Sequence, residues 1–392
     1  MRTIYLDHSA GTPVRDEVFR AMLPYLKDAY GNPSSIHHKG REAYDATTNA
    51  RAEVAQTLGV HTNEIIFTSG GTEANNLALF GIAHAHSNLK KHILVSAIEH
   101  DSVLKIAKQL SENGFGVEYI PVDEYGMVHV EDVMARVRND TLLISIMYAN
   151  NEIGTIEPIA EIAKALREKF GDARPLFHTD ACQAPGQLRI SPHELGVDLM
   201  TLNSGKIYGP KGVGMLYVRE GVRITPQIVG GEQERHLRAG TENVAGVVGF
   251  ARALALAHTE TVHMAQQLTE LRDVFIHDVM TSIPDTILSG HPHDRLPGNA
   301  HFIFPSIEGE ALVLLLDTYG ICASTGSACN AHDLVPSHVL RAVGKAPEHI
   351  HGSVRFTLGM GTTQDDITYT TTSLVACVER LRALSPLPLK IL

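Results

Sequence analysis

The sequence has few cysteines, no long hydrophobic run and no excess of positive charge. Its 392 residues include four cysteines, too few for a disulfide scaffold, which favours a reducing cytosol. No apolar run reaches the roughly 18 residues that span a bilayer, so we expect no membrane association. A formal net charge of −11 argues against direct nucleic-acid binding, which needs a basic surface. The N-terminus, MRTIYLDHSAG, has the pattern of neither a signal peptide nor a transit peptide.

The patterns that are present indicate an α/β protein. From about residue 64 to residue 220, short apolar and β-branched runs alternate with helical patterns. Such strands between helices indicate a mostly parallel sheet covered by helices on both faces. We therefore predict a large α/β domain at residues 14–257. Residues 1–13 and 258–392 are predicted to form a smaller α+β domain.

One helical pattern is unusually long. Residues 242–282 keep helical periodicity with no proline, and with no glycine after Gly249. Because this exceeds an ordinary globular helix, the segment either bridges two domains or is broken.

Polar segments follow four of the predicted strands at the point where each strand ends. They are residues 67–71, 96–100, 147–151 and 178–183. In open α/β sheets, ligands bind outside the carboxyl ends of the strands. We therefore expect a ligand site along this edge of the sheet.

Asp180, Gln183 and Lys206 are the most informative set, in HTDACQ and NSGKIYGPKG. A carboxylate at a strand end, an amide three residues later and a lysine in a Gly-rich turn suit the binding of pyridoxal 5'-phosphate (PLP). The lysine bonds to the cofactor, the carboxylate keeps the pyridine nitrogen protonated, and the amide hydrogen-bonds the ring hydroxyl. Taken singly, Lys206 or nearby Lys211 would be a solvated loop lysine, and Asp180 a helix N-cap.

The segment SGGTEANN follows a strand and opens a helix. Its glycines let the backbone approach an anion, and free N–H groups with the helix dipole favour phosphate there. Gly71 and Thr72 are the candidate donors. The alternative is an ordinary strand–helix turn capped by Thr72.

His100 and Arg355 are two further candidates for the site. His100 ends a strand segment, where an imidazole can stack on a bound ring and move protons near neutral pH. Arg355 lies in the strand pattern SVRFTLG, and an arginine so placed can clamp a carboxylate. The alternatives are a helix N-terminal residue without chemistry and a structural salt bridge.

Cys329 lies among small residues in ASTGSACNAHD, which suits an exposed loop. A nucleophilic thiolate needs access and a lowered pKa. Cys182 is instead predicted to be a small buried residue. A zinc site of Cys322, Cys329, His332 and His338 is the alternative, but the C-x6-C spacing matches no standard site. We predict no metal site, and transient iron–sulfur ligation by Cys329 stays open.

Taken together, the motifs resemble the cysteine desulfurase family of the class V aminotransferase superfamily, in the branch of the NifS and IscS proteins. The resemblance covers nearly the whole chain, and the motifs keep their order. They are YLDHSAGTPV, GNPSSIH, FTSGGTEANN, EH, NNEIGT, HTDACQ, KIYGPKGVG, RAGTEN, STGSAC, VPSHVLRA and SVRFTLG.

The resemblance implies a PLP-dependent transferase of fold type I, built as a homodimer with active sites near the interface. The large domain would bind PLP, and the small domain would carry the catalytic cysteine loop. The implied catalytic residues are Cys329, Lys206 and His100, while Arg355, with Asn151 near the cofactor, would bind substrate. The implied cofactor-binding residues are Lys206, Gly71, Thr72, His100, Asn151, Asp180, Gln183, Asn203, Ser204, Gly205 and the partner subunit's Thr241.

One position departs from the family pattern. Family members commonly carry histidine immediately before the PLP lysine, whereas Gly205 stands there in this sequence. The imidazole that helps to hold the phosphate is therefore absent, and Ser204 or Asn203 would have to compensate.

The resemblance implies that L-cysteine is converted to L-alanine. The sulfur would pass as a persulfide on Cys329 to an acceptor, such as an iron–sulfur scaffold or a tRNA-thiolation protein. Two alternatives stay open. One is a selenocysteine lyase or another PLP-dependent β-eliminating lyase, with Cys329 dispensable. The other is a sulfur-carrier or scaffold-binding partner with weak catalysis.

Overall fold

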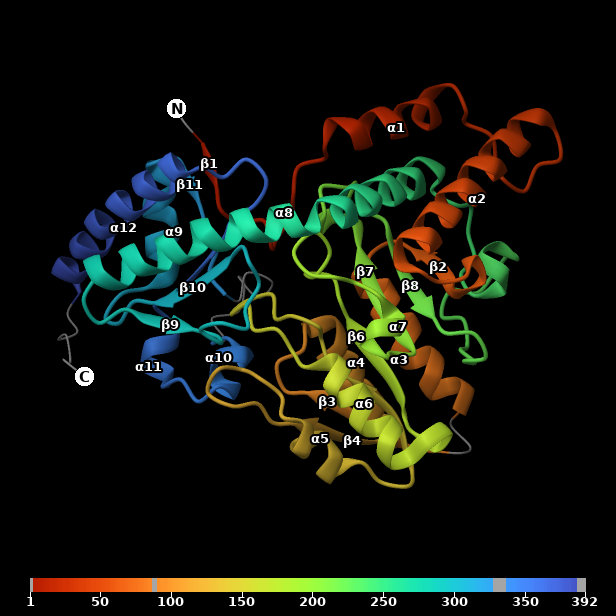
Figure 1. Cartoon of the computed structure of the whole chain (residues 1–392), viewed down its shortest axis with the longest axis horizontal. Helices are drawn as coiled ribbons and strands as arrows, with labels where there is room; N and C mark the ends of the chain where they lie inside the picture. Colours follow the sequence, from red (N-terminus) through yellow and green to blue (C-terminus); the bar gives the residue numbers. More distant parts are fainter. Residues whose placement is uncertain (1–2, 87–89, 327–335, 386–392) are drawn as a thin grey trace.

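The structure is a computed structural model that describes residues 3–86, 90–326 and 336–385. Figure 1 shows two α/β lobes lying side by side, joined along one face by a long helix, α8 (Val244–Ser282). None of the described helices is long and apolar enough to cross a membrane.

The larger lobe is built on a seven-stranded sheet with the order β2-β8-β7-β6-β5-β3-β4. All neighbouring pairs from β7 to β4 are parallel, whereas β8 runs antiparallel to both of its neighbours. The predicted mostly parallel sheet is therefore confirmed. Its strands are β2 (Ile65–Thr68), β3 (His92–Ser96), β4 (Gly116–Ile120), β5 (Thr141–Ser145), β6 (Leu176–Asp180), β7 (Leu199–Asn203) and β8 (Gly214–Val218).

Helices cover both faces of this sheet because alternate strand residues point to opposite sides. Ile66 and Ile93 pack with α3 and α4, whereas Phe67 and Leu94 pack on the opposite face, in the core shared by α2, α6 and α8. The covering helices are α1 (Asp16–Lys27), α2 (His38–Leu58), α3 (Gly71–His86), α4 (Asp101–Glu112), α5 (Val130–Arg136), α6 (Ile159–Phe170) and α7 (Pro192–Leu195).

The long helix α8 runs unbroken for 39 residues. Phe250, in its first half, is buried in the core of the large sheet, and Phe275, in its second half, is buried in a separate core. The helix therefore bridges the two lobes. Of the two expectations from the sequence, a bridging helix and a broken one, the first is confirmed.

The smaller lobe has an antiparallel sheet of order β12-β10-β9 and a parallel pair, β1-β11. Helices α9 and α12 pack against its core with the end of α8. The domain boundaries at residues 13/14 and 257/258 stay a prediction. The elements of this lobe are β1 (Ile4–Tyr5), β9 (Ile287–Ser289), β10 (Asn299–Ile303), β11 (Ile321–Cys322), β12 (Ser353–Thr357), α9 (Gly309–Thr318), α10 (His338–Ala342), α11 (Pro347–Ile350) and α12 (Gln364–Leu384).

The N-terminal segment passes from the smaller lobe to the larger one. Leu6 is hydrogen-bonded through its backbone to Cys322 and to Thr357, in the small lobe. Six residues later, the Thr12 N–H donates to the Gly205 carbonyl at 3.0 Å. Residues 7–12 therefore lie against the turn that carries Lys206.

Candidate active site

One pocket collects most of the predicted site residues at the carboxyl edge of the large sheet. Ser204, Gly205 and Thr241 are not among the residues that line it, and Cys329 lies outside the described residues. Gly326, three residues before Cys329 in the sequence, does line the pocket. The predicted residues found there are Gly71, Thr72, His100, Asn151, Asp180, Gln183, Asn203, Lys206 and Arg355.

Asp180 is the last residue of β6, and only 7% of its surface is exposed. Its Oδ2 accepts a hydrogen bond of 2.8 Å from Asn75 Nδ2, and its Oδ1 accepts one of 2.9 Å from the Cys182 backbone N–H. Both oxygens are therefore fixed by neutral donors. Among the described residues no cation pairs with this carboxylate, which fits its predicted pairing with a protonated ring nitrogen.

The predicted phosphate site is the first turn of α3, which begins at Gly71. A Cβ at Gly71 would lie 2.8 Å from Cys182 Sγ, so only glycine fits this close approach. The free N–H groups of this turn and the helix dipole favour an anion. The donor set therefore fits a phosphate group.

Lys206 lies in a short 3-10 turn, Ser204–Lys206, directly after β7. Its Nζ donates to the carbonyls of Ser9 at 2.5 Å and Ala10 at 2.8 Å. Lys211 Nζ instead donates to the Thr12 carbonyl, and Lys211 does not line the pocket. The geometry thus favours Lys206 over Lys211 as the cofactor lysine.

Ser204 or Asn203 was predicted to compensate for the missing histidine. Asn203 lines the pocket, and its Oδ1 accepts from the Gly205 N–H at 3.2 Å. Ser204 is fully buried outside the pocket lining, and its hydroxyl has no hydrogen-bond partner among the described residues. The compensating role therefore belongs to Asn203 alone, as a prediction.

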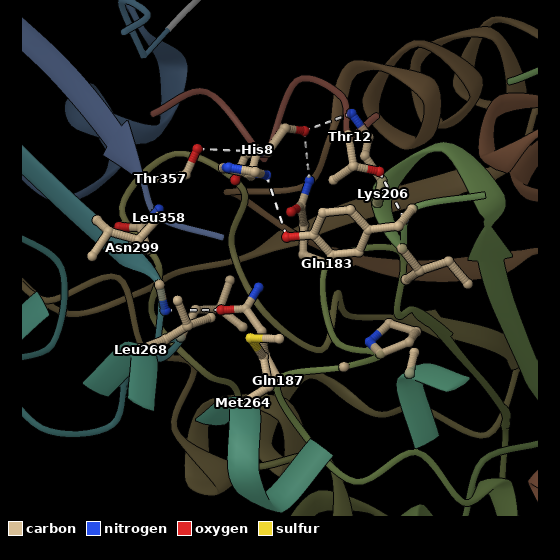
Figure 2. Close-up of a pocket in the computed structure, with 18 of the residues that line it drawn as sticks. His8, Thr12, Gln183, Gln187, Lys206, Met264, Leu268, Asn299, Thr357 and Leu358 are labelled. Atoms are coloured by element: carbon tan, nitrogen blue, oxygen red, sulfur yellow. Dashed lines mark hydrogen bonds between the residues drawn. The ribbon is translucent and has the colours of Figure 1, made fainter. Parts of the chain in front are cut away.

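Gln183 and Lys206 also line a second pocket, between the two lobes (Figure 2). Gln183 Nε2 donates to the Ser9 carbonyl at 3.2 Å. The far end of this pocket is apolar, with Met264 and Leu268 of α8. It contains neither Asp180 nor the first turn of α3, so the chemistry belongs to the first pocket.

His100 is the N-cap residue of α4. Its Nδ1 accepts from the Ser102 N–H at 3.1 Å and lies 2.8 Å from Ser102 Oγ. Its ring therefore stands at the pocket edge in one fixed orientation.

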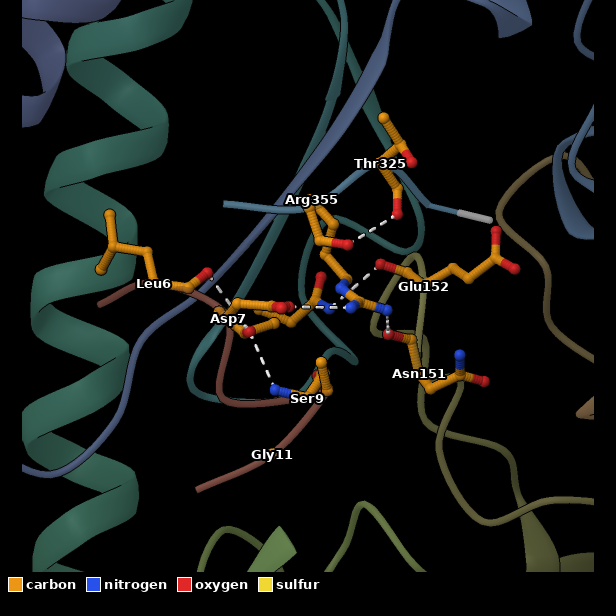
Figure 3. A network of polar contacts seen from close by, with 12 residues as sticks. Leu6, Asp7, Ser9, Gly11, Asn151, Glu152, Thr325 and Arg355 are labelled. Atoms are coloured by element: carbon orange, nitrogen blue, oxygen red, sulfur yellow. Dashed lines mark hydrogen bonds and ion pairs between the residues drawn. The ribbon is translucent and has the colours of Figure 1, made fainter. Parts of the chain in front are cut away.

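Arg355 lies on β12, and its guanidinium reaches the pocket from the small lobe (Figure 3). Nη2 forms an ion pair of 3.0 Å with Asp7 Oδ1, and Nη1 donates to the Asn151 carbonyl at 3.0 Å. Nε is buried without a partner among the described residues. The predicted structural salt bridge thus exists, and the binding of a substrate carboxylate by the same guanidinium stays a prediction.

Glu152 and Glu99 are buried carboxyls that sequence reasoning missed. Burial raises the pKa of Glu152 to about 7, although it accepts a 2.6 Å hydrogen bond from Ser337 Oγ. Burial likewise raises the pKa of Glu99 to about 8, although Ser96 and Met147 donate to it. Each directly precedes or follows a predicted site residue, which was the available signal.

Asn75, Ser102 and Asp7 were also missed. Asn75 lies four residues after Gly71, so helical spacing places it one turn along the same face of α3. That spacing could have identified it. Ser102 and Asp7 carry no comparable signal, because their partners are set by the tertiary fold.

Cys182 is partly buried beside Asp180. Burial, and then the neighbouring carboxylate, raises the pKa of its thiol well above the ordinary value. This supports its prediction as a structural residue and not a nucleophile. Within the described ranges, no group of three or more His, Cys, Asp or Glu side chains could hold a metal ion. Two members of the zinc alternative, Cys329 and His332, lie outside those ranges.

Comparisons with known proteins agree with this geometry. The model of the family Aminotransferase class-V matches residues 4–369. Cysteine desulfurase IscS of Dictyoglomus turgidum is 50% identical over 385 residues, which cover 98% of this chain and 97% of that protein. A solved NifS-like protein is 38% identical, with a TM-score of 0.91, covering 97% of this chain and 100% of that one. A solved structure of SspA in complex with cysteine is 33% identical, with a TM-score of 0.78 and coverage of 91% and 99%.

Proposed function

We propose a function for each site residue on the basis of the family to which the chain belongs. The chain is a member of the class V aminotransferases and, among them, of the cysteine desulfurases. It is a PLP-dependent enzyme with the fold type I architecture. Its reaction converts L-cysteine to L-alanine and passes the sulfur on as a persulfide. The observation that carries the proposal is the meeting of Lys206, Asp180 and Arg355 in one pocket.

The residues of the large domain would hold PLP. Asp180 would pair with the pyridine nitrogen, Gln183 would hydrogen-bond the ring hydroxyl, and His100 would stack on the ring. When bound, PLP withdraws electrons from the bonds at the substrate α-carbon. The phosphate would rest on Gly71 and Thr72, with Asn203 beside them and the partner subunit's Thr241 completing the site.

The small domain would bind the substrate, and its cysteine nucleophile would attack it. Arg355 binds the cysteine carboxylate through its guanidinium, next to Asn151. Lys206 Nζ moves the proton at the α-carbon. The Cys329 thiolate attacks the substrate sulfur, so a sulfur–sulfur bond forms while the carbon–sulfur bond breaks and its electron pair stays on carbon. Protonation of that carbon yields alanine.

Cys329→Ser tests the proposal most directly, with Cys322→Ser as the matched control. The serine variant should keep PLP absorbance and lose persulfide formation and sulfide release from cysteine by at least about a hundredfold. Cys322→Ser should behave as wild type, because Cys322 lies at β11 outside the pocket lining. Sulfide production retained in Cys329→Ser would remove Cys329 as the nucleophile and favour the β-eliminating lyase.

A homodimer is part of the same proposal. The large lobe exposes apolar side chains that a single chain leaves uncovered, and Thr241 is exposed away from its own pocket. Sedimentation should therefore show a dimer. The acceptor would be an iron–sulfur scaffold or a tRNA-thiolation protein, in the reducing cytoplasm that the low cysteine count favours. The exposed residues that support the interface are Phe19, Leu23, Leu26, Tyr30, Ile36, Tyr44, Ile228 and Val229.

A further inference from the structure

Two side chains outside the predicted set connect Asp180 to His100. Asn75 of α3 is fully buried, and its Nδ2 lies 2.8 Å from Asp180 Oδ2 and 2.9 Å from Ser102 Oγ. Ser102 Oγ in turn lies 2.8 Å from His100 Nδ1. The four side chains form one continuous chain of hydrogen bonds, from the strand-end carboxylate to the imidazole that caps α4.

The direction of each hydrogen bond follows from the chemistry of its ends. The Asp180 carboxylate only accepts, so Asn75 must turn its NH2 group toward it. This holds although Asn75 Oδ1 is then buried without a partner among the described residues. The second Nδ2 hydrogen is directed at Ser102 Oγ. The Ser102 hydroxyl, having accepted this hydrogen, has its own hydrogen to donate to His100 Nδ1.

The backbone places a second donor at the same ring nitrogen. The Ser102 N–H donates to His100 Nδ1 at 3.1 Å, as expected for an N-cap side chain. A ring nitrogen that accepts hydrogen bonds carries no hydrogen, so the hydrogen of the neutral imidazole lies on Nε2.

We infer that Asn75 and Ser102 are positioning residues that hold His100 as its Nε2–H tautomer. This inference rests on the proposed function for its catalytic meaning. Nδ1 is engaged by both donors of Ser102, and Nε2 already carries a hydrogen. His100 therefore serves the reaction as a hydrogen-bond donor at Nε2, and proton abstraction at the substrate α-carbon falls to Lys206 Nζ alone.

The tautomer is tested by 15N NMR of the holoenzyme labelled at histidine, with the His100 signals assigned by their loss in His100→Asn. Wild type should show an unprotonated Nδ1 that accepts hydrogen bonds and a protonated Nε2. In Ser102→Ala the Nδ1 signal should shift toward that of a nitrogen with fewer hydrogen bonds. Ser102→Thr should restore it, and Ser111→Ala, on the exposed side of the same helix, should leave it unchanged.

Kinetics supply the second readout. Ser102→Ala should lower kcat about fivefold, the effect of one neutral hydrogen bond, with KM unchanged. Asn75→Ala should shift the same Nδ1 signal and also weaken PLP binding, because Asp180 loses a donor. Asn76→Ala is the matched control, since the Asn76 side chain donates to the Thr72 carbonyl of its own helix.

Two results would overturn the inference: a hydrogen on His100 Nδ1 in wild type, or an Nδ1 signal that is the same in Ser102→Ala as in wild type. Failure of the proposed function gives a different result. A wild-type enzyme that forms no alanine from cysteine would reject the desulfurase reaction, while the NMR spectra would still decide the tautomer.

Discussion

The two sides of the pocket are built from different kinds of contact. On the cofactor side, Gly71 and Lys206 stand just after strands of one sheet and Asp180 ends another strand of it, and the Asp180 carboxylate is held by neutral donors. On the substrate side, Arg355 is held by an ion pair with Asp7, 348 residues earlier in the chain, and by the Asn151 carbonyl.

Because of this difference, the residues proposed to bind the cofactor and those proposed to bind the substrate lie in different parts of the molecule. Gly71, Asp180 and Lys206 of the cofactor side all lie in the larger lobe, so the sheet of that lobe sets where they stand. The substrate side joins the small lobe, the N-terminal segment and the loop after β5. Changes on the first side should therefore affect PLP binding, whereas changes on the second should affect the KM for cysteine.

The largest effect is expected from Lys206→Ala on the cofactor side. Borohydride should no longer attach PLP to the protein, and kcat should fall by at least about a hundredfold because the proposed base is lost. Lys211→Ala is the control, since its Nζ contacts only the Thr12 carbonyl in the part of the chain that the structure describes. Trapping that depends on Lys211 would contradict the assignment, and so would trapping that survives in Lys206→Ala.

A smaller and more selective effect is expected from Arg355→Lys on the substrate side. Lysine keeps the charge but lacks the planar fork that binds a carboxylate through two N–H groups. The KM for cysteine should rise about ten- to a hundredfold, the effect of a hydrogen bond to a charged group, while PLP affinity stays at the wild-type value. Arg341→Lys, at an exposed position of α10, is the control. Loss of PLP from Arg355→Lys would erase the distinction between the two sides.

The same distinction explains what the sequence could predict. The residues predicted for the cofactor side meet in one pocket because each lies at or just after the end of a strand, and parallel strands end at one edge of the sheet. Most strands of that sheet contain a short apolar run, as in β2, β3, β5 and β8. Strands β1 and β11 have two residues each, which is too short for any periodicity, so neither was predicted.

The substrate side depends on contacts between distant segments. Arg355 was predicted from its strand context, but its partner Asp7 was not, because nothing local links the two positions. Ser102 was missed for a related reason. It is an ordinary helix residue until the fold of α3 and α4 brings its hydroxyl within 2.9 Å of Asn75 Nδ2.

The smallest predicted effect concerns pH, and it compares one buried carboxyl from each side. Burial raises the pKa of Glu99, beside His100, to about 8, and that of Glu152, beside Arg355, to about 7. Each folded carboxyl therefore stays protonated above the pH at which it ionises in the unfolded chain. Its contribution to stability is complete below the unfolded pKa of 4.5 and is lost as pH rises through the folded pKa.

The window from pH 7 to pH 8 separates the two carboxyls. The buried imidazoles of His178 and His301, with pKa values lowered to about 4 and about 3, act in the opposite direction, but only below their unfolded value of 6.5. In this window Glu99 should therefore cost the wild type on the order of 1 kcal/mol of unfolding free energy. Glu99→Gln keeps an acceptor for the Met147 N–H and should flatten the decline in denaturant midpoint, whereas Glu152→Gln should leave most of it. An equal flattening in both variants would show that the two carboxyls titrate together, and that the two sides of the pocket are electrostatically one site.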